Sequence, residues 1–329
     1  MKIKRLVIEN FKSIERIELL EPNPFTVFVG PNGSGKSNIF EALEFENFKK
    51  KFLSNEGASD LLVSLFGGAT SFLRRQSIDN WFNFEIETEY ISIMSRSAYS
   101  REYQSGPIKF VSINQHKEEP TAHPDYEQFY RNFTRLFIRN EKLRKLPLND
   151  DKRLALDASN LEKVLKRILT DDILKNEIFE WLDLFVPGFK TVEIDDRDEL
   201  HWFEKSSSDY FTKDLISDGT YNILSLLTAV YQSNEPQFLC IEEPENGLHP
   251  QVLETLVDFF RQQCKDKGHF IWLNTHSEAI VRHLTTDEII LVNKHNGATQ
   301  TRQIKGRSIY DLPTDQAWLT GALGGGLPW

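Results

Sequence analysis

Residues 30–37, with the sequence GPNGSGKS, constrain the fold of this chain more than any other segment. A short β-branched and aromatic run, FTVFV, precedes them, and Ile39, Phe40 and Leu43 follow at helical spacing. Glycines let backbone N–H groups converge on phosphate oxygens, and the positive end of the following helix points at the same anion. The sequence therefore predicts a strand, a phosphate loop and a helix; the alternative is a capped glycine turn without a ligand.

Within this loop we expect Lys36 to reach the β and γ phosphates of a nucleotide and the Ser37 hydroxyl to ligate Mg²⁺. The residues predicted to contact the nucleotide in and after the loop are Gly30, Pro31, Asn32, Gly33, Ser34, Gly35, Lys36, Ser37 and Asn38.

The C-terminal half predicts a parallel sheet. Residues 237–241 and 269–274 are apolar runs typical of buried strands, and residues 250–264 between them have helical spacing. Strand, helix and strand in this order favour an α/β fold with a sheet covered on both faces. The first strand ends in Glu242 and Glu243, which are costly to bury unless a cation neutralises them; the alternative is a solvated strand end.

Other segments suggest additional lobes. Residues 10–22 are interpreted as a second edge strand and a turn, and residues 81–94 and 108–113 alternate as an antiparallel meander would. Residues 125–185 have a helical pattern, and residues 217–231 form an apolar helix capped by Ser217. We predict one domain, 1–329, with a nucleotide-binding core (1–50 and 232–329), an antiparallel β lobe (51–120) and a helical insertion with its capped helix (121–231).

Composition narrows the class of protein. The 329 residues carry a net charge of −10, with 40% hydrophobic and 27% charged residues, so the chain is globular and any polyanion site is local. Two cysteines, Cys240 and Cys264, give neither a disulfide framework nor a zinc cluster, which favours a reducing, cytoplasmic compartment. No apolar run reaches the roughly 20 residues that span a bilayer, so no membrane association is expected.

Residues 131–153 are locally basic, and Arg131, Arg135 and Arg139 would line one face of a helix, suited to a phosphate backbone. A solvated helix face is the alternative. The other basic residues of the stretch are Lys142, Arg144, Lys145, Lys152 and Arg153.

Five short segments together resemble the ATP-binding-cassette (ABC) ATPases of the RecF, SMC and OLD group. They are NFKSI at 10–14, GPNGSGKSN at 30–38, SDGT at 217–220, IEEPENGLHP at 241–250 and NTHS at 274–277. The segment EEPENGLHP, together with AWLTGALGGGLPW at the C-terminus, is most similar to short stand-alone ATPases related to the OLD-family head, without a TOPRIM nuclease domain.

The resemblance implies a role for individual residues, with ATP and Mg²⁺ as cofactors. Glu242 would be the magnesium-linked acid, although the family more often has Asp there, and Glu243 would polarise the attacking water. His276 would sense the γ phosphate; the alternative is an ordinary buried histidine. Ser217, Asp218 and Gly219 would contact the γ phosphate bound by a second subunit, unless Ser217 is only a helix cap. Asn246 would lie in the loop that crosses the dimer interface, and Lys12 and Ser13 would approach the nucleotide. The magnesium-sensing glutamine has two candidates, Gln76 and Gln115.

The function implied by this resemblance is an ATP-hydrolysing switch that dimerises around two ATP molecules. It would control a separately encoded effector, such as a nuclease or toxin, in bacterial defence against phage. The alternative is a RecF-like repair factor that binds DNA through residues 131–153.

Overall fold

A ten-stranded sheet organises the molecule. The computed structural model describes residues 1–52, 64–68, 71–74, 81–98, 123–138, 150–307, 309 and 312–323. The strand order is β5-β4-β1-β2-β12-β11-β3-β10-β9-β6. The strands are β1 (Ile3–Phe11), β2 (Ile14–Leu20), β3 (Phe25–Val29), β4 (Trp81–Thr88), β5 (Ser92–Ala98), β6 (Phe133–Leu136), β9 (Phe238–Glu242), β10 (Phe270–Thr275), β11 (Ile289–His295) and β12 (Ala298–Gln303).

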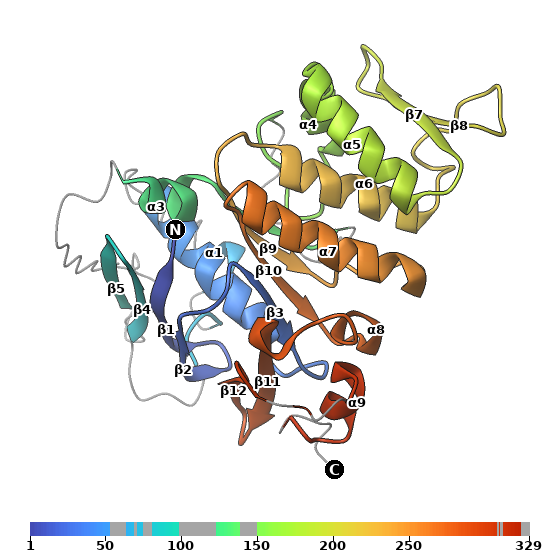
Figure 1. Cartoon of the computed structure of the whole chain (residues 1–329). Coiled ribbons are helices and arrows are strands. Elements are labelled where there is room, and N and C mark those ends of the chain that lie inside the picture. Colours follow the sequence, from blue (N-terminus) through green and yellow to red (C-terminus); the bar gives the residue numbers. More distant parts are fainter. Residues whose placement is uncertain are drawn as a thin grey trace.

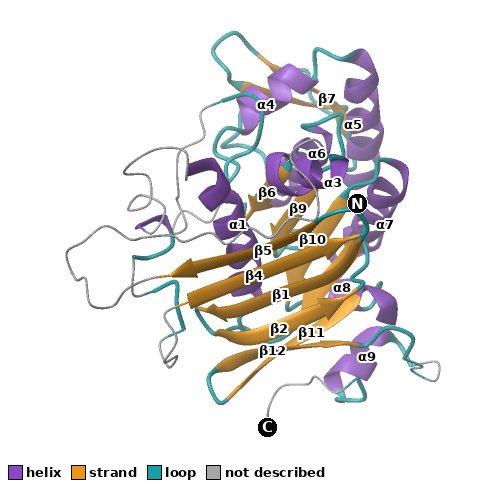
Figure 2. Ribbon diagram, turned by 90° about the vertical axis from the view of Figure 1, so that its left-hand side faces the viewer, coloured by secondary structure: helices purple, strands orange, loops and turns teal. Residues whose placement is uncertain are grey.

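The sheet has a parallel half and a largely antiparallel half. β11, β3, β10, β9 and β6 run parallel, whereas β2, β1, β4 and β5 pair antiparallel. Figure 2 shows β5, β4, β1, β2, β12 and β11 side by side. The α/β fold predicted from the sequence is confirmed, as is the mostly parallel core with antiparallel strands on its N-terminal side.

Helices cover both faces of the parallel half (Figure 1). In β9, Leu239 and Ile241 point into one core, and Phe238 and Cys240 point into the other. The first core contains α4 (Leu161–Ile168), α5 (Asp172–Phe185), α6 (Asp218–Tyr231), α7 (Pro250–Asp266), α8 (Glu278–Val281) and α9 (Thr314–Leu319); the second contains α1 (Lys36–Phe52) and the short α3 (Pro124–Tyr126). Strands buried on both faces explain the unbroken apolar runs of β3, β9 and β10.

Two expectations from the sequence were wrong. Strand β2 is not an edge strand, because it lies between β1 and β12. Residues 125–185 are not helical throughout, because β6 lies within them and pairs parallel with β9. The helical spacing of apolar residues there comes from α3, a π-helical turn at Glu127–Arg131, α4 and α5.

Three further predictions concern the additional lobes and membrane spans. The strand expected at 108–113 lies outside the described residues. The described part of 51–120 adds β4 and β5 to the common sheet, and β7 (Phe189–Ile194) with β8 (Leu200–Glu204) forms a separate hairpin. The division into core, β lobe and helical insertion stays a proposal. In the described parts of the chain, no helix is long and apolar enough to cross a bilayer.

Candidate nucleotide-binding site

The phosphate loop lies between the end of β3 and the start of α1, as predicted. Gly35 has φ +99°, and a Cβ there would lie 2.0 Å from Thr299 Oγ1 and 2.7 Å from Ser13 Oγ. At Gly30 a Cβ would lie 2.0 Å from the carbonyl oxygen of Val292. Both positions therefore require glycine, because the side chains of Thr299 on β12 and Ser13 in the β1–β2 turn, and the backbone of Val292 on β11, lie directly behind the loop.

Lys36 lies over the loop at the start of α1. Its Nζ donates hydrogen bonds to the carbonyl oxygens of Gly30 (2.6 Å) and Pro31 (3.0 Å). Burial lowers the pKa of this amine, and the nearby carboxylates of Glu243, Glu245 and Glu242 oppose that shift. A partly buried ammonium group at a helix N-terminus is suited to an anionic ligand such as a phosphate.

Ser37 and Glu242, the two predicted metal ligands, lie together. Ser37 Oγ donates to Glu242 Oε2 at 2.5 Å, so the longer glutamate side chain does reach the loop serine. Glu242 is buried and also bonds Arg135 Nε (2.6 Å) and Asn274 Nδ2 (3.2 Å). Two oxygen donors at this place fit Mg²⁺, a hard cation that prefers oxygen ligands and is usually held by one or two carboxylates and substrate phosphates.

Glu243 is held at the same edge of the sheet in an unusual backbone conformation. It has φ +47°, and its N–H donates to the carbonyl oxygen (3.0 Å) and side-chain oxygen (3.1 Å) of Asn274. Its carboxylate accepts from Asn246 Nδ2 at 3.1 Å and lies 3.4 Å from His276 Nδ1. His276 is exposed, which rules out the alternative of an ordinary buried histidine. The structure thus brings Glu243, Asn246 and His276 together.

The capped helix α6 contacts the loop that follows the acidic pair. Ser217 caps α6, with Oγ accepting from Thr220 N at 3.0 Å. A Cβ on Gly219 would lie 2.4 Å from the carbonyl oxygen of Gly247. Asn222 Nδ2 donates to the carbonyl oxygens of Pro244 (2.9 Å) and Asn246 (2.8 Å). A Cβ on Gly247 would lie 3.4 Å from Asp218 Cβ, so Asp218 and Gly219 in the first turn of α6 lie next to this loop.

Lys12 and Ser13, both in the β1–β2 turn, support the loop and its helix. Ser13 Oγ lies 2.6 Å from Thr299 Oγ1 and accepts from Asn38 Nδ2 at 2.6 Å. Lys12 forms an ion pair with Glu41 of α1. The remaining loop residues Pro31, Asn32, Gly33 and Ser34 lie in the turn itself, where Ser34 N donates to the Pro31 carbonyl at 3.2 Å.

The proposed basic helix face is wrong. Arg135 lies on β6 with its side chain fully buried, whereas Arg131 ends the π-helical turn and pairs with Glu127 at 3.1 Å. Arg153 is partly buried and bonds Asn132 at 2.9 Å, and Lys152 is exposed. Arg139, Lys142, Arg144 and Lys145 lie outside the described residues, as do Gln76 and Gln115.

Sequence reasoning missed the roles of Arg135, Asn222, Asn274 and Thr299. Asn274 could have been suspected because it ends a buried strand one residue before Thr275 in the NTHS segment. Thr299 carries no local signal, because its partner Ser13 is 286 positions away in the chain.

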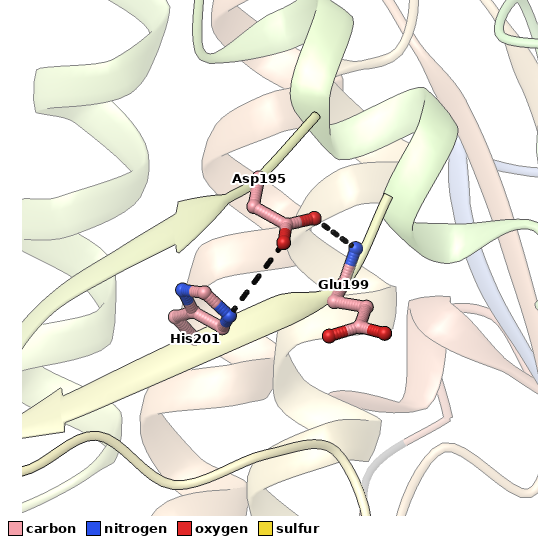
Figure 3. A group of neighbouring side chains, drawn as sticks. All are labelled: Asp195, Glu199 and His201. Atoms are coloured by element: carbon pink, nitrogen blue, oxygen red, sulfur yellow. Dashed lines mark hydrogen bonds and ion pairs between the residues drawn. The ribbon is translucent and has the colours of Figure 1, made fainter. Parts of the chain in front are cut away.

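A second cluster of potential metal ligands lies in the turn of the β7–β8 hairpin (Figure 3). Asp195 accepts hydrogen bonds from the backbone N–H groups of Arg197 and Glu199, both at 2.8 Å, and these bonds lower its pKa. His201 Nε2 lies 4.0 Å from the same carboxylate. These contacts close the turn, and we assign the cluster this structural role.

Comparisons with known proteins give a family match and several similar relatives. Residues 25–282 match the model of a family described as "AAA domain, putative AbiEii toxin, Type IV TA system". An "ATP/GTP phosphatase" of Helicobacter pylori is 20% identical over 354 residues, covering 94% of each chain. The DNA replication and repair protein RecF of Mannheimia succiniciproducens is 40% identical over 55 residues, covering 17% of this chain and 15% of RecF.

A solved structure shows the same fold. The Smc head domain of Pyrococcus furiosus, bound to the C-terminal domain of ScpA, superposes with a TM-score of 0.59 at 14% identity, covering 92% of this chain and 96% of that one. The fold and the site together define an ABC-type ATPase of the RecF and SMC group. Within it, the chain belongs to the family of AAA domains whose description names the AbiEii toxin.

Proposed function

We propose that the chain binds and hydrolyses ATP and that two copies enclose two ATP molecules between them. The observation that carries this proposal is the grouping of Ser37, Glu242 and Glu243 beside the phosphate loop. Bound Mg²⁺ would neutralise phosphate charge and polarise the γ phosphoryl group. Glu243, oriented by Asn246 and backed by His276, would accept the proton of the attacking water.

The second subunit enters this proposal through α6. The N-terminus of a helix is an anion site, and the first turn of α6 carries Ser217 and Gly219 next to the loop after Glu243. In this arrangement α6 of one subunit contacts the γ phosphate held by the phosphate loop of the other subunit. The contacts between Asn222 and the loop after Glu243 would link that event to the acidic pair of the subunit that supplies α6. Closing such an interface removes water from both phosphates and strengthens the fixed dipoles that act on them.

We further propose a cytoplasmic switch that controls a separately encoded effector in defence against phage, as in short OLD-type ATPases. The family description, which names a toxin and a toxin–antitoxin system, supports an effector role by analogy. The Smc head solved with ScpA supports the idea that such a head binds a protein partner.

Hydrolysis tests the proposal directly through Glu243→Gln. Because a general base contributes roughly 10²- to 10⁴-fold, turnover should fall by that factor, while ATP affinity changes by less than about threefold. Steady-state phosphate release and equilibrium binding of a fluorescent ATP analogue measure the two quantities. Turnover equal to that of the unaltered protein would remove Glu243 from the chemistry.

The RecF-like alternative loses much of its support, because Arg135 is buried against Glu242 and cannot face DNA. Of its three remaining described cations, Arg131 and Lys152 are exposed and Arg153 is partly buried. An Arg131→Glu, Lys152→Glu variant that binds duplex DNA in ATP as well as the unaltered protein, with the same salt dependence, would remove residues 131–153 as the DNA contact.

A further inference from the structure

A fully buried arginine, Arg135, lies next to the candidate metal site without being one of its expected ligands. Arg135 belongs to β6, opposite Cys240 of β9. Its Nε and Nη2 both donate to Glu242 Oε1, the first at 2.6 Å, and its Nη1 donates to Glu44 Oε2 at 2.7 Å. Glu41 Oε1 lies 3.5 Å from the same Nη1.

The charges around Arg135 keep it protonated. Burial alone would lower its pKa, but the carboxylates of Glu242, Glu44 and Glu41 outweigh burial and raise it. Glu41 also pairs with Lys12, so this cluster holds two cations among three carboxylates. Arg135 is the cation that the adjacent buried carboxylate of Glu242 requires.

The two oxygens of Glu242 have different partners. Oε1 accepts two N–H groups from the guanidinium group of Arg135. Oε2 accepts from Ser37 Oγ and from Asn274 Nδ2, on the side of the phosphate loop. Only Oε2 therefore lies beside the other expected metal ligand.

Glutamate has one more rotatable bond than aspartate, so a glutamate at this position needs an additional restraint to present one oxygen reproducibly. The planar guanidinium group of arginine supplies such a restraint through paired hydrogen bonds in a fixed geometry. Lysine, a point charge on a flexible stem, cannot reproduce it.

We propose that Arg135 is a positioning residue for the metal site: it fixes Oε1 of Glu242 so that Oε2 faces Ser37 and Mg²⁺. This inference rests on the proposed nucleotide-binding function. Arg135 acts through Glu242 and touches neither metal nor phosphate. A purely structural role, in which Arg135 only joins β6 to α1 through Glu44, is the competing explanation.

The test uses Arg135→Lys in the full chain, with Glu44→Gln as the matched control on the other side of the same guanidinium group. Binding of a fluorescent ATP analogue is measured in EDTA and then against Mg²⁺ concentration. Residues that orient metal ligands typically contribute tenfold to a hundredfold to metal affinity. Arg135→Lys should raise the half-saturating Mg²⁺ concentration by about tenfold or more, with affinity in EDTA unchanged within about threefold. Glu44→Gln should leave both within about threefold.

Two results would overturn the inference: an unchanged Mg²⁺ dependence in folded Arg135→Lys, or equal losses of affinity with and without Mg²⁺. If Arg135→Lys does not fold, the charge-balanced variant Arg135→Gln, Glu44→Gln replaces it, with the same expected Mg²⁺ shift, because it removes one buried charge of each sign. If the unaltered protein binds no nucleotide in either condition, the proposed function fails as well. If the unaltered protein binds nucleotide in a Mg²⁺-dependent way and Arg135→Lys shows the same dependence, only the positioning role is rejected.

Discussion

At the scale of single residues, Gly35 connects the sequence motif to distant parts of the chain. Its φ of +99° disfavours any side chain, and a Cβ would meet Thr299 Oγ1 at 2.0 Å. Gly35→Ala should therefore lower the free energy of unfolding by about 1–3 kcal/mol and weaken ATP binding at least about tenfold. Thermal unfolding without nucleotide and equilibrium binding check these values.

Gly33 provides the control for this substitution. It also has a positive φ, +78°, but a Cβ there would meet nothing within 4 Å. Gly33→Ala should destabilise the protein by less than Gly35→Ala, because only the backbone strain remains. Equal destabilisation by both substitutions would show that Thr299 does not limit the space behind the loop.

Glu245 makes the stability of the folded protein depend on pH. It is mostly buried, its Oε1 accepts a hydrogen bond from the Thr275 hydroxyl, and its Oε2 has no hydrogen-bond partner among the described residues. Burial, opposed by the Thr275 bond, raises its pKa from 4.5 to about 7. The folded protein therefore holds this proton more tightly than the unfolded chain, and the stability that Glu245 contributes below pH 4.5 is lost as the pH rises through about 7.

Glu245→Gln tests this linkage. Because the variant cannot ionise there, its free energy of unfolding relative to the unaltered protein should increase between pH 5 and pH 8, by at most about 3 kcal/mol. Denaturant unfolding at both pH values measures the difference. A difference that does not change with pH would mean that Glu245 titrates near its ordinary pKa.

At the scale of elements, Asn222 couples α6 to the loop after Glu243. Asn222→Ala should leave the carbonyl oxygens of Pro244 and Asn246 without this donor, destabilise the protein by about 2 kcal/mol and lower kcat more than ATP affinity. Ser225→Ala is the control, since Ser225 is also buried in α6 but its hydroxyl donates to the Tyr221 carbonyl of its own helix. Similar losses of kcat in both variants would contradict a coupling role for Asn222.

The elements predicted correctly from sequence are those whose signal is local. β3, α1, β9, α7 and β10 each have an apolar run or helical spacing that tertiary contacts reinforce. β6 was missed because it has only four residues and contains a charged one, Arg135. The carboxylates that neutralise Arg135 come from α1 and β9, at 91 and 107 positions along the chain, so no local pattern could indicate its burial.

In the candidate site, too, only the parts with a local sequence signal could be predicted. The loop, the acidic pair and the Ser217 cap are contiguous motifs and were placed by their sequence alone. The supporting contacts of Asn274, Thr299 and Asn222 depend on which strands and helices become neighbours. The spacing of residues in a single sequence does not indicate which strands and helices will be neighbours.

For the molecule as a whole, we propose that each complete ATP site contains the phosphate loop of one subunit and the Ser217 helix of another. Lys36→Ala should lack nucleotide binding, and Ser217→Arg should block ATP-dependent dimerisation through a bulky cation at the helix N-terminus. Each variant alone should therefore have negligible ATPase activity, although each retains the half of the site that the other lacks.

The most direct measurement is the ATPase rate of the two variants mixed in equal amounts. A mixed dimer has one intact site, formed by Lys36 of the Ser217→Arg chain and Ser217 of the Lys36→Ala chain. With random pairing, a site shared between two subunits predicts roughly a quarter of the unaltered activity in the mixture. Activity of Ser217→Arg alone equal to that of the unaltered protein, or no recovery in a mixture that light scattering shows to contain dimers, would contradict it.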